Sequence, residues 1–270
     1  MRGDLSIRHI HRLLGWSRSS YYAAPRPPPV VDEAVAQQVR HLHARSHRSG
    51  GARTISHGLR RMGIDMGRER TATVMRLLSL TAKKKPFHHY ARNTKPAPAG
   101  NHLNRQFDPG WANRAWASDI TYVPTQQGWL YLAVVIDLFS RRVVGWATGR
   151  VADARLAVEA SALAFALRQP GPGLIVHSDQ GCQYTSDLYV AHLREHRAVQ
   201  SMSRKGNCWD NAVVERFFRS LKQEWIDGPY RTRDEARHAV IDYAVRYYNH
   251  ERLHSTLGYR PPAEFEALAA

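Results

Sequence analysis

WASDITYVPTQQGWLYLAVVID, residues 116–137, decides the fold expected of this chain of 270 residues. Its second part, residues 129–137, is apolar enough to be a central strand, and residues 117–122 are short and rich in β-forming side chains. Residues 143–147 predict a third strand, after a turn at Ser140 and Arg141. Three strands in sequence favour an antiparallel, hairpin-connected arrangement.

The pattern beyond residue 150 alternates between helix and strand. Apolar periodicity predicts helices over residues 153–167, 186–196, 211–226 and 234–249, and short strands over residues 174–177 and 199–202. Added to the three hairpin strands, this order predicts an α/β fold, in which a mixed five-stranded sheet has helices on both faces.

The chain before residue 111 is expected to be helical and then irregular. Residues 1–29 predict an N-terminal helical segment, and residues 30–82 predict a small all-α, helix-turn-helix-like region with one helix over residues 31–46 and a helical pair around Gly63. Residues 83–110 are basic, rich in Pro and Gly and without periodicity, which predicts an extended linker. Residues 111–270 then hold the α/β core and a C-terminal helical tail.

The net charge of +16 is unevenly distributed. Residues 1–110 carry 20 Lys and Arg against 6 Asp and Glu, whereas residues 111–270 carry 19 against 17. A strongly basic front half favours binding to a polyanion such as nucleic acid, because each phosphate contact releases counterions. A basic surface that serves solubility alone is the alternative interpretation.

The cysteines and the hydropathy of the sequence indicate in which cellular compartment the protein is found. Cys182 and Cys208 provide neither a disulfide framework nor a Cys-x-x-Cys metal site. No run approaches the roughly 18 apolar residues that cross a bilayer. We therefore expect a cytoplasmic protein without a membrane partner.

Three acidic residues stand out in the predicted core: Asp119 in the first strand, Asp179 directly after the fourth, and Glu215 in the helix that begins at residue 211. Functional crevices of open α/β sheets gather at strand ends, so neighbouring first and fourth strands would bring Asp119 and Asp179 together. Crowded carboxylates repel one another unless cations neutralise them, which favours a hard divalent metal. Each acid also has a structural explanation, as a polar strand residue, a turn former or a solvated helix residue.

Basic residues near these acids and in the front half are candidates for contacts with DNA phosphates. Arg219 and Lys222 follow Glu215 by four and seven residues, on one stripe of the helix. The other candidates are Arg204 and Lys205 in the preceding loop, Arg68, Arg70 and Arg76 on the last helix of the front half, and Lys83, Lys84 and Lys85 at the start of the linker. An ordinary solvated surface explains the arginines of the front helix equally well.

Three polar residues near the acids in the sequence are expected to have structural rather than catalytic roles. His177 closes a predicted strand and is expected to be a satisfied structural residue rather than a ligand. Asp210 or Asn211 precedes the long helix and is expected to cap it.

The residues above fall within longer motifs: WASDITY at 116–122, HSDQGCQYTS at 177–186, SMSRKGNCWDNA at 201–212 and YNHERLHSTLGYRP at 248–261. Asp179 and Glu215 are separated by 35 residues, and LGWSRSSYY at 14–22 lies upstream. This set resembles the DDE transposases and retroviral integrases. It is most similar to the second-frame (OrfB-type) transposases of the frameshifting insertion-sequence 3 family.

The resemblance implies a ribonuclease-H-like core in which Asp119, Asp179 and Glu215 are the catalytic residues and hold two Mg²⁺ ions, with Mn²⁺ as a substitute. It implies DNA 3′-end cleavage followed by strand transfer, a phosphodiester transesterification. No zinc is expected, because no paired cysteines accompany His9, His11, His41 and His43.

The resemblance also implies partners: double-stranded DNA of the element ends and target, a first-frame polypeptide or fusion, and further copies of the chain on DNA, near the bacterial nucleoid. Two rival functions remain open. One is a non-catalytic, DNA-binding repressor form of a transposase. The other is an RNA–DNA hybrid nuclease, which would not need the basic helical front half.

Overall fold

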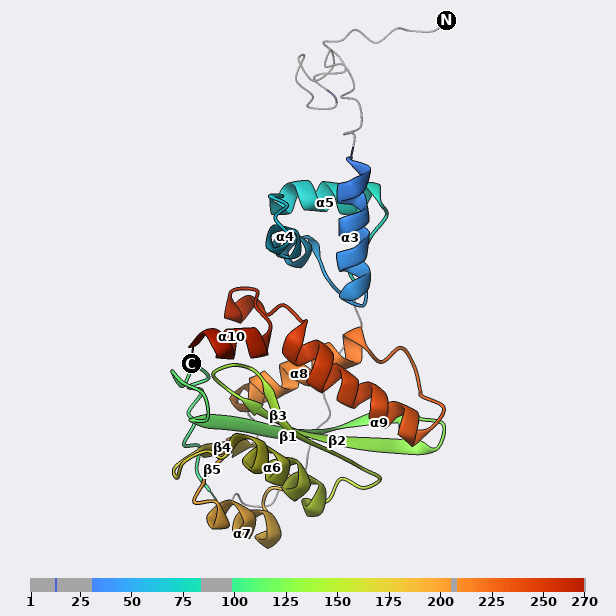
Figure 1. Cartoon of the computed structure of the whole chain (residues 1–270). Helices are drawn as coiled ribbons and strands as arrows, with labels where there is room; N and C mark the ends of the chain where they lie inside the picture. The colour runs from blue at the N-terminus through green and yellow to red at the C-terminus, as the bar shows by residue number, and fades with distance from the viewer. Residues whose placement is uncertain (1–12, 14–30, 84–98, 205–207, 270) are drawn as a thin grey trace, which may run out of the picture.

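The computed structural model describes residues 13, 31–83, 99–204 and 208–269 (Figure 1). They form a three-helix unit and a larger α/β unit, which follows it along the chain. The helical segment predicted over residues 1–29 lies outside the described residues, apart from Leu13.

A mixed five-stranded sheet forms the centre of the α/β unit. Its order is β3-β2-β1-β4-β5, with β1–β2 and β2–β3 antiparallel and β1–β4 and β4–β5 parallel. The strands are β1 (Ala115–Thr125), β2 (Gly128–Asp137), β3 (Val143–Gly149), β4 (Ile175–Ser178) and β5 (Val199–Met202). The predicted mixed sheet is confirmed, and its order is that of a ribonuclease-H-like fold.

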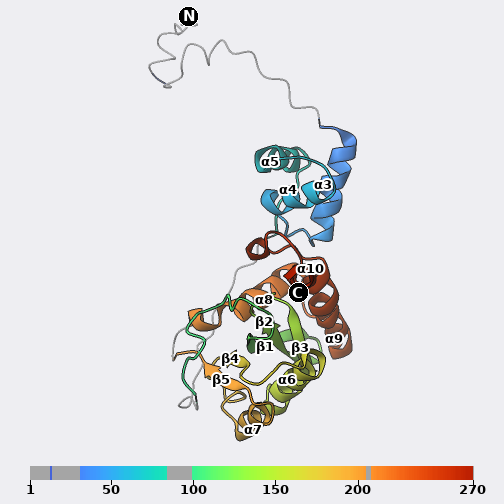
Figure 2. The ribbon, with the colours of Figure 1, turned by 60° about the vertical axis from the view of Figure 1, so that its left-hand side comes forward.

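Helices cover both faces of this sheet (Figures 1 and 2). One face, with Trp116 and Val135, packs against α6 (Ala154–Arg168) and α7 (Asp187–Glu195). The other, with Ala117 and Val134, packs against α8 (Ala212–Glu224) and α9 (Arg233–Ile241). Because side chains alternate along a strand, the odd-numbered residues of β1 point towards α8.

The alanine-rich sequence of α6 fits its close approach to β3. A side-chain Cβ at Gly145 would lie only 2.2 Å from the carbonyl oxygen of Ala160. Small residues on the helix and a glycine on the strand therefore let the two backbones pack directly, which a larger residue at position 145 would prevent.

The three-helix unit has a core of its own. Its helices are α3 (Glu33–Arg45), α4 (Ala52–Arg61) and α5 (Arg68–Leu77). Asp32 caps α3, because its Oδ1 accepts the Ala34 N–H at 2.8 Å. The apolar stripes of the helices meet in one cluster, which includes Val39, Ile55, Leu59, Val74 and Met75. The predicted small all-α region is confirmed.

The second half of the segment expected to be a linker, residues 83–110, is packed in the structure rather than extended. Residues 84–98 lie outside the described residues, but the chain from residue 99 packs against the α/β unit. Leu103 is 2% exposed, and its N–H donates to Ser201 Oγ at 3.0 Å. Leu103 and Phe107 both join the core cluster beneath α8. Two isolated apolar residues among polar ones give no periodicity, so the sequence pattern did not indicate this packing.

The helix predicted over residues 234–249 has two parts. α9 ends at Ile241, and a π-helix, η2 (Asp242–Tyr248), continues it and buries Tyr243, Tyr247 and Tyr248. A sequence pattern with a period of 3.6 residues does not distinguish a π-helix, which has a wider turn, from an α-helix. The short 3-10 turns η1 (Cys208–Asn211) and η3 (Ser255–Leu257) and the helix α10 (Pro262–Ala269) complete the unit.

The three-helix unit rests on the C-terminal part of the α/β unit (Figure 1). The Arg61 guanidinium donates two bonds to Glu264, at 2.9 and 2.6 Å. His57 stacks on Tyr259 with ring centroids 3.7 Å apart. Arg61 and Glu264 are partly exposed, so this pair contributes at most about 1 kcal/mol and weakens with salt.

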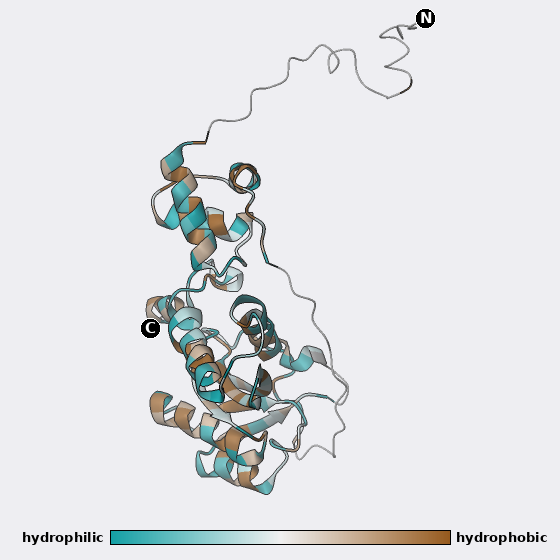
Figure 3. Cartoon of the chain, turned by 90° about the vertical axis from the view of Figure 1, so that its right-hand side faces the viewer, coloured by the Kyte–Doolittle hydropathy of each residue, from teal (hydrophilic) through white to brown (hydrophobic). Residues whose placement is uncertain are grey.

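Figure 3 shows hydrophilic and hydrophobic stretches alternating along the helices of both units, as expected of helices with one buried face. In the described part of the chain, no helix combines the length and the apolar character that a membrane span needs.

Candidate active site and nucleic-acid interface

Asp119 and Asp179 occupy neighbouring positions on two parallel strands. The register of β1 and β4 pairs Ala117 with His177, and each aspartate comes two residues later. β4 ends at Ser178 while β1 continues to Thr125, so the aspartates stand where the ladder between the strands ends. This is the carboxyl end of β4, and α/β sheets collect functional residues at such strand ends.

Backbone N–H groups orient both carboxylates. Ile120 N–H donates to Asp119 Oδ1 at 2.7 Å, and Gly181 N–H donates to Asp179 Oδ1 at 2.9 Å. Asp119 is buried, whereas Asp179 is half-buried. A glycine at 181 keeps the turn after β4 tight, because a Cβ there would lie 3.0 Å from Asp179 Oδ1.

Glu215 lies on the first turn of α8, which packs against β1. Asn211, at the start of the helix, donates from its side-chain amide to the Ser118 carbonyl oxygen at 3.2 Å. Glu215 follows Asn211 by four residues and lies on the same helix face. Asp119 is an odd-numbered residue of β1 and points to the α8 side of the sheet. The fold therefore places the three predicted acids on adjoining elements.

The carboxylate oxygens near the end of β4 suit a hard divalent ion whose remaining ligands are water or substrate oxygens. No group of three or more His, Cys, Asp and Glu side chains within the described ranges is arranged to hold a metal ion. Mg²⁺ is commonly bound by one or two protein carboxylates, with water and substrate phosphate oxygens as its other ligands. Asp119 and Asp179, which follow paired positions of β1 and β4, are carboxylates of the kind that this ion prefers, with Glu215 as the third candidate.

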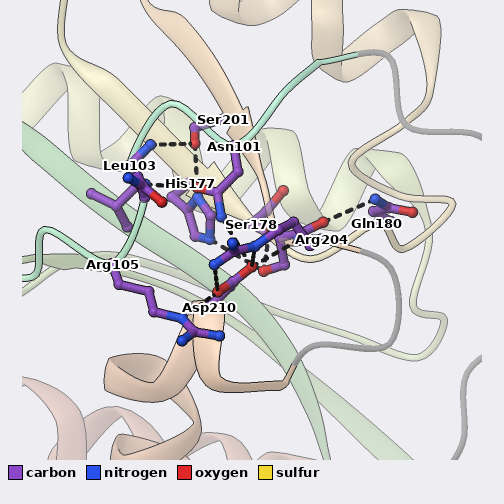
Figure 4. A network of polar contacts seen from close by, with 11 residues as sticks. Asn101, Leu103, Arg105, His177, Ser178, Gln180, Ser201, Arg204 and Asp210 are labelled. Carbon is purple, nitrogen blue, oxygen red and sulfur yellow. Dashed lines mark hydrogen bonds and ion pairs between the residues drawn. The ribbon is translucent and has the colours of Figure 1, made fainter.

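The buried carboxylate of Asp210 is the centre of an ion-pair network with two partly exposed arginines (Figure 4). Its side chain is 0% exposed and accepts from the guanidinium groups of Arg204, at 2.9 Å, and Arg105, at 2.7 Å. The Asn101 amide donates to it at 3.0 Å. Hydrogen bonds from Arg204, and then from Arg105, hold the pKa of Asp210 well below its ordinary value.

The expectation that Asp210 or Asn211 caps α8 is wrong. Asn211 occupies the cap position without a side-chain capping bond, since its amide reaches Ser118, and Asp210 is engaged by the arginines. One partner of Asp210, Asn101, lies 109 residues earlier in the chain. No local pattern therefore indicated the role of Asp210.

His177 is a structural residue, as its position at a strand end predicts. It is 0% exposed, and its ring nitrogens lie 2.9 Å from Ser201 Oγ and 3.2 Å from Ser203 Oγ (Figure 4). Burial lowers its pKa to about 4, although nearby Asp210 opposes the shift. The ring is therefore neutral at physiological pH and joins β4 to β5.

A second structural aspartate was also missed from the sequence. Asp137 ends β2, is fully buried, and accepts from the N–H groups of Asn113, Phe139 and Ser140 at 2.7 to 3.0 Å. An aspartate after an apolar strand and before a serine three residues later is typical of a side chain that closes a turn, and this signal was present.

Three of the predicted DNA-contacting cations form ion pairs within the protein, among them Arg68, which lies 3.8 Å from Glu69. Arg204 donates to Asp210 through Nε and Nη2, and the Lys83 ammonium pairs with Asp227. The Lys83 carbonyl also accepts from the Gln223 amide at 2.7 Å. Arg204 and Lys83 thus have intramolecular roles in this structure.

The other candidates differ in their surroundings. Arg68, Arg70 and Arg76 are exposed on α5. On α8, the Lys222 ammonium lies 4.6 Å from the centre of the Tyr122 ring, which orients it beside β1. Lys84, Lys85 and Lys205 lie outside the described residues.

A cavity of about 530 Å³ separates the three-helix unit from α8 and the C-terminal tail. Cations from both units line it, among them Arg45, Arg61, Arg216 and Arg219. The acids Glu224 and Glu251 in its wall are fewer than the cations, so the surface is positive.

Comparison with known proteins assigns a class to this fold and site. Models of an integrase core domain match residues 111–208 and 196–262, and a model of an HTH-like domain matches residues 31–87. The protein is therefore of the transposase and integrase class, with an integrase core that follows an HTH-like domain.

Relatives of known name narrow this class to one family. The chain is 39% identical over 246 residues to the transposase for insertion sequence element IS904 of Lactococcus lactis subsp. lactis (strain IL1403), covering 90% of this chain and 97% of the relative. It is 37% identical over 276 residues to transposase InsF for insertion sequence IS3A of Escherichia coli (strain K12), covering 98% and 95%. The chain belongs to the insertion-sequence 3 family of transposases.

Among solved structures, it is similar to the HTLV-2 integrase catalytic core domain in complex with magnesium, with a TM-score of 0.45 and 18% identity over 58% of this chain and 98% of that one.

Proposed function

We propose that this transposase cleaves DNA at the 3′ ends of its element and joins them to a second DNA site, with Asp119, Asp179 and Glu215 as the catalytic residues. The observation that carries the proposal is the β1–β4 register: Asp119 and Asp179 each come two residues after the paired Ala117 and His177, and Asp179 directly follows the carboxyl end of β4. The contact between Asn211 and Ser118 supports the third member, because it holds the first turn of α8 against the same part of β1.

Two successive displacements at phosphorus account for the reaction. In the first, water attacks the phosphodiester, the bond from phosphorus to the 3′ oxygen breaks, and the element end leaves as a 3′-hydroxyl. In the second, that hydroxyl attacks another phosphodiester and releases a new 3′-hydroxyl. One phosphodiester replaces another in this step, so no high-energy cofactor is consumed. Catalysis then consists mainly of positioning and charge stabilisation.

The three carboxylates would hold Mg²⁺ or Mn²⁺ together with phosphate oxygens of DNA. A bound divalent ion supplies Lewis-acid stabilisation of the charge at phosphorus. The chain's own contribution is to fix the carboxylates: the Ile120 and Gly181 N–H groups orient Asp119 and Asp179, and the Asn211–Ser118 bond holds the start of α8, which carries Glu215, against β1.

The DNA backbone would meet cations on both units. Lys222 and Arg219 extend along α8 from Glu215, and Arg219 also lines the positive cavity beneath the three-helix unit. Arg68, Arg70 and Arg76 project from α5. We propose that these residues bind phosphates, in complexes that include further copies of the chain and a first-frame polypeptide.

The proposal is tested by incubating the protein with labelled element-end DNA and Mg²⁺, with and without the first-frame polypeptide. Wild type should release a 3′-hydroxyl end, and Asp179→Asn should bind DNA equally well without cutting it. Asp187→Asn is the matched control, because Asp187 is an exposed aspartate on α7, eight residues further along the chain. Asp187→Asn should cut like wild type.

Two results would count against the proposal. Cutting by Asp179→Asn at the wild-type rate would exclude the carboxylate mechanism. Tight DNA binding without cutting by wild type, under every partner and metal condition, would favour the non-catalytic repressor instead.

A further inference from the structure

Asp210 joins three segments of the α/β unit immediately before the helix that carries Glu215. Asn101 and Arg105 belong to the segment by which the chain enters this unit, and Arg204 follows β5. Arg204 donates to Asp210 from its backbone N–H, at 3.0 Å, as well as from its guanidinium, so the ends of residues 204–210 are held together. α8 begins two residues later.

A fully buried carboxylate is costly unless each of its oxygens is hydrogen-bonded. Here both oxygens are used: Oδ1 accepts from Arg105 and Arg204, and Oδ2 accepts from Asn101 and Arg204 (Figure 4). The bonds to Asp210 come from several directions and therefore fix its position. Because Asn211 is bonded to Ser118 at the next position, the first turn of α8 is fixed against β1 as well.

We propose that Asp210 is a positioning residue for Glu215: its ion pairs with Arg204 and Arg105 fix the start of α8, and with it the third carboxylate, relative to Asp119 and Asp179. This inference rests on the function proposed above. Asp210 itself touches neither the DNA nor the reacting atoms. It acts through α8, and it makes the placement of Glu215 depend on the segment that contains Asn101 and Arg105.

The magnitude expected follows from the sensitivity of catalysis to geometry. A misplacement of about 1 Å in a catalytic group lowers a rate by about 10²-fold. Asp210→Asn keeps the size of the side chain but removes the charge that attracts both arginines, so the start of α8 should loosen while the sheet stays intact. DNA binding depends on surface cations and should be little changed.

The experiment compares Asp210→Asn, Arg204→Gln and Arg105→Gln with wild type in the full-length protein. Asp242→Asn is the matched control, because Asp242 makes a similar two-bond pair with Arg246, at 2.6 and 2.7 Å, on η2. Hydrogen exchange is measured first, on the protein without DNA or metal. Asp210→Asn should speed exchange at least tenfold at amides 213–216 and leave β1 and β2 unchanged, and Asp242→Asn should change neither region.

Activity is measured second, as a function of Mg²⁺ concentration. Asp210→Asn should lower kcat for 3′-end cleavage by about 10²-fold, raise the Mg²⁺ concentration for half-maximal rate at least threefold, and change the Kd for DNA less than twofold. Arg204→Gln should lower kcat and raise the Mg²⁺ requirement by smaller factors. Adding Arg204→Gln to Asp210→Asn should cost little more, because the two changes remove one shared interaction.

The outcomes separate this inference from the proposed function. If wild type cuts no DNA, the proposed function fails, and the exchange data still decide whether Asp210 fixes α8. Faster exchange spread evenly over the sheet, or an unchanged Mg²⁺ requirement in a variant of low kcat, would show that Asp210 serves stability alone and would overturn the proposal. If Asp210→Asn does not fold, Arg204→Gln and Arg105→Gln carry the same test.

Discussion

Arg252 and Glu224 form an ion pair inside the protein, with Nη2 and Oε1 2.7 Å apart and side chains 19% and 6% exposed. The Tyr243 hydroxyl also donates to Glu224, at 3.1 Å. Burial lowers the pKa of Arg252, but the charge and hydrogen bonds of Glu224, together with Tyr243 and Tyr248, outweigh burial and raise the pKa. Since Glu224 ends α8, this pair ties the helix that carries Glu215 to the C-terminal tail.

Breaking this pair from one side should strongly destabilise the fold. Arg252→Leu leaves the Glu224 carboxylate buried without its counter-ion, and we expect the free energy of unfolding to fall by about 3–5 kcal/mol. Urea unfolding measures this. Adding Glu224→Leu should recover part of the loss, because the orphaned charge is removed. Arg246→Leu, which breaks an exposed pair with Asp242, is the control and should cost about 1 kcal/mol or less; equal losses for the two arginines would contradict the prediction.

Gly181→Ala should impair cleavage without unfolding the protein. The new Cβ would lie 3.0 Å from Asp179 Oδ1 and 2.8 Å from Gln183 Oε1. The glutamine end can move, but the Asp179 carboxylate must shift from the Gly181 N–H that orients it. We expect cleavage to fall by roughly tenfold or more, with a melting temperature close to that of wild type. Gly171→Ala has open space around it and should be neutral in both assays. A fully active Gly181→Ala variant would mean that the turn does not set Asp179.

Acidification should destabilise the protein through His177. Its pKa falls from 6.5 to about 4 on folding, because the ring is buried. Between these values the unfolded chain binds a proton that the folded chain excludes, so this stabilisation is complete above pH 6.5 and is lost as the pH falls towards 4. The loss is up to about 3 kcal/mol. Urea unfolding at pH 7, 5.5 and 4.5 should show a smaller pH dependence in His177→Gln than in wild type. The exposed His238→Gln should retain the wild-type dependence.

The sequence predicted the elements of the sheet well, because their signals are local. The alternation of apolar strands and amphipathic helices lies within each segment, and the predicted strand over residues 199–202 has the same bounds as β5. The strand order was left open: Asp119 and Asp179 were expected to meet if the first and fourth strands were neighbours, and β1 does adjoin β4. Periodicity depends on little beyond neighbouring residues, whereas strand order depends on pairing between distant segments.

The interactions that fix the candidate site could not be predicted in the same way. Asp210 meets Asn101 and Arg105, which are more than 100 residues away along the chain. Leu103 is buried by partners that come from β5 and the sheet, in a stretch whose composition is typical of a linker. Such contacts depend on the folded arrangement of distant segments, and a pattern within one segment carries no signal for them.

Docking of the three-helix unit should depend on ionic strength. Arg61–Glu264 and Arg45–Glu251 are partly exposed pairs between the two units, and screening weakens such pairs. Glu264→Gln should increase tryptic cleavage between residues 77 and 99 at 50 mM NaCl. The cleavage rate of this variant at 50 mM NaCl should then be similar to that of wild type at 1 M NaCl. The pKa of Glu264 is lowered by its bonds to Arg61, so acidification that protonates this carboxyl should have the same effect. Glu33→Gln removes a pair within α3 and should leave the cleavage unchanged.

DNA binding by the exposed arginines of α5 should appear in the salt dependence of affinity. Each phosphate contact contributes about −0.9 to the slope of log K against log salt concentration. Arg68→Ala and Arg70→Ala should therefore each reduce the magnitude of the slope by about 0.9 and weaken binding to all duplexes alike, measured by fluorescence anisotropy from 50 to 300 mM NaCl. Arg40→Ala is the control, because Arg40 is exposed on α3 and lies 2.8 Å from Glu33, closer than the 3.8 Å between Arg68 and Glu69, and its slope should match wild type. An unchanged slope in both α5 variants would show that this helix presents an ordinary solvated face, and the cations of α8 and the cavity would then have to provide the phosphate contacts.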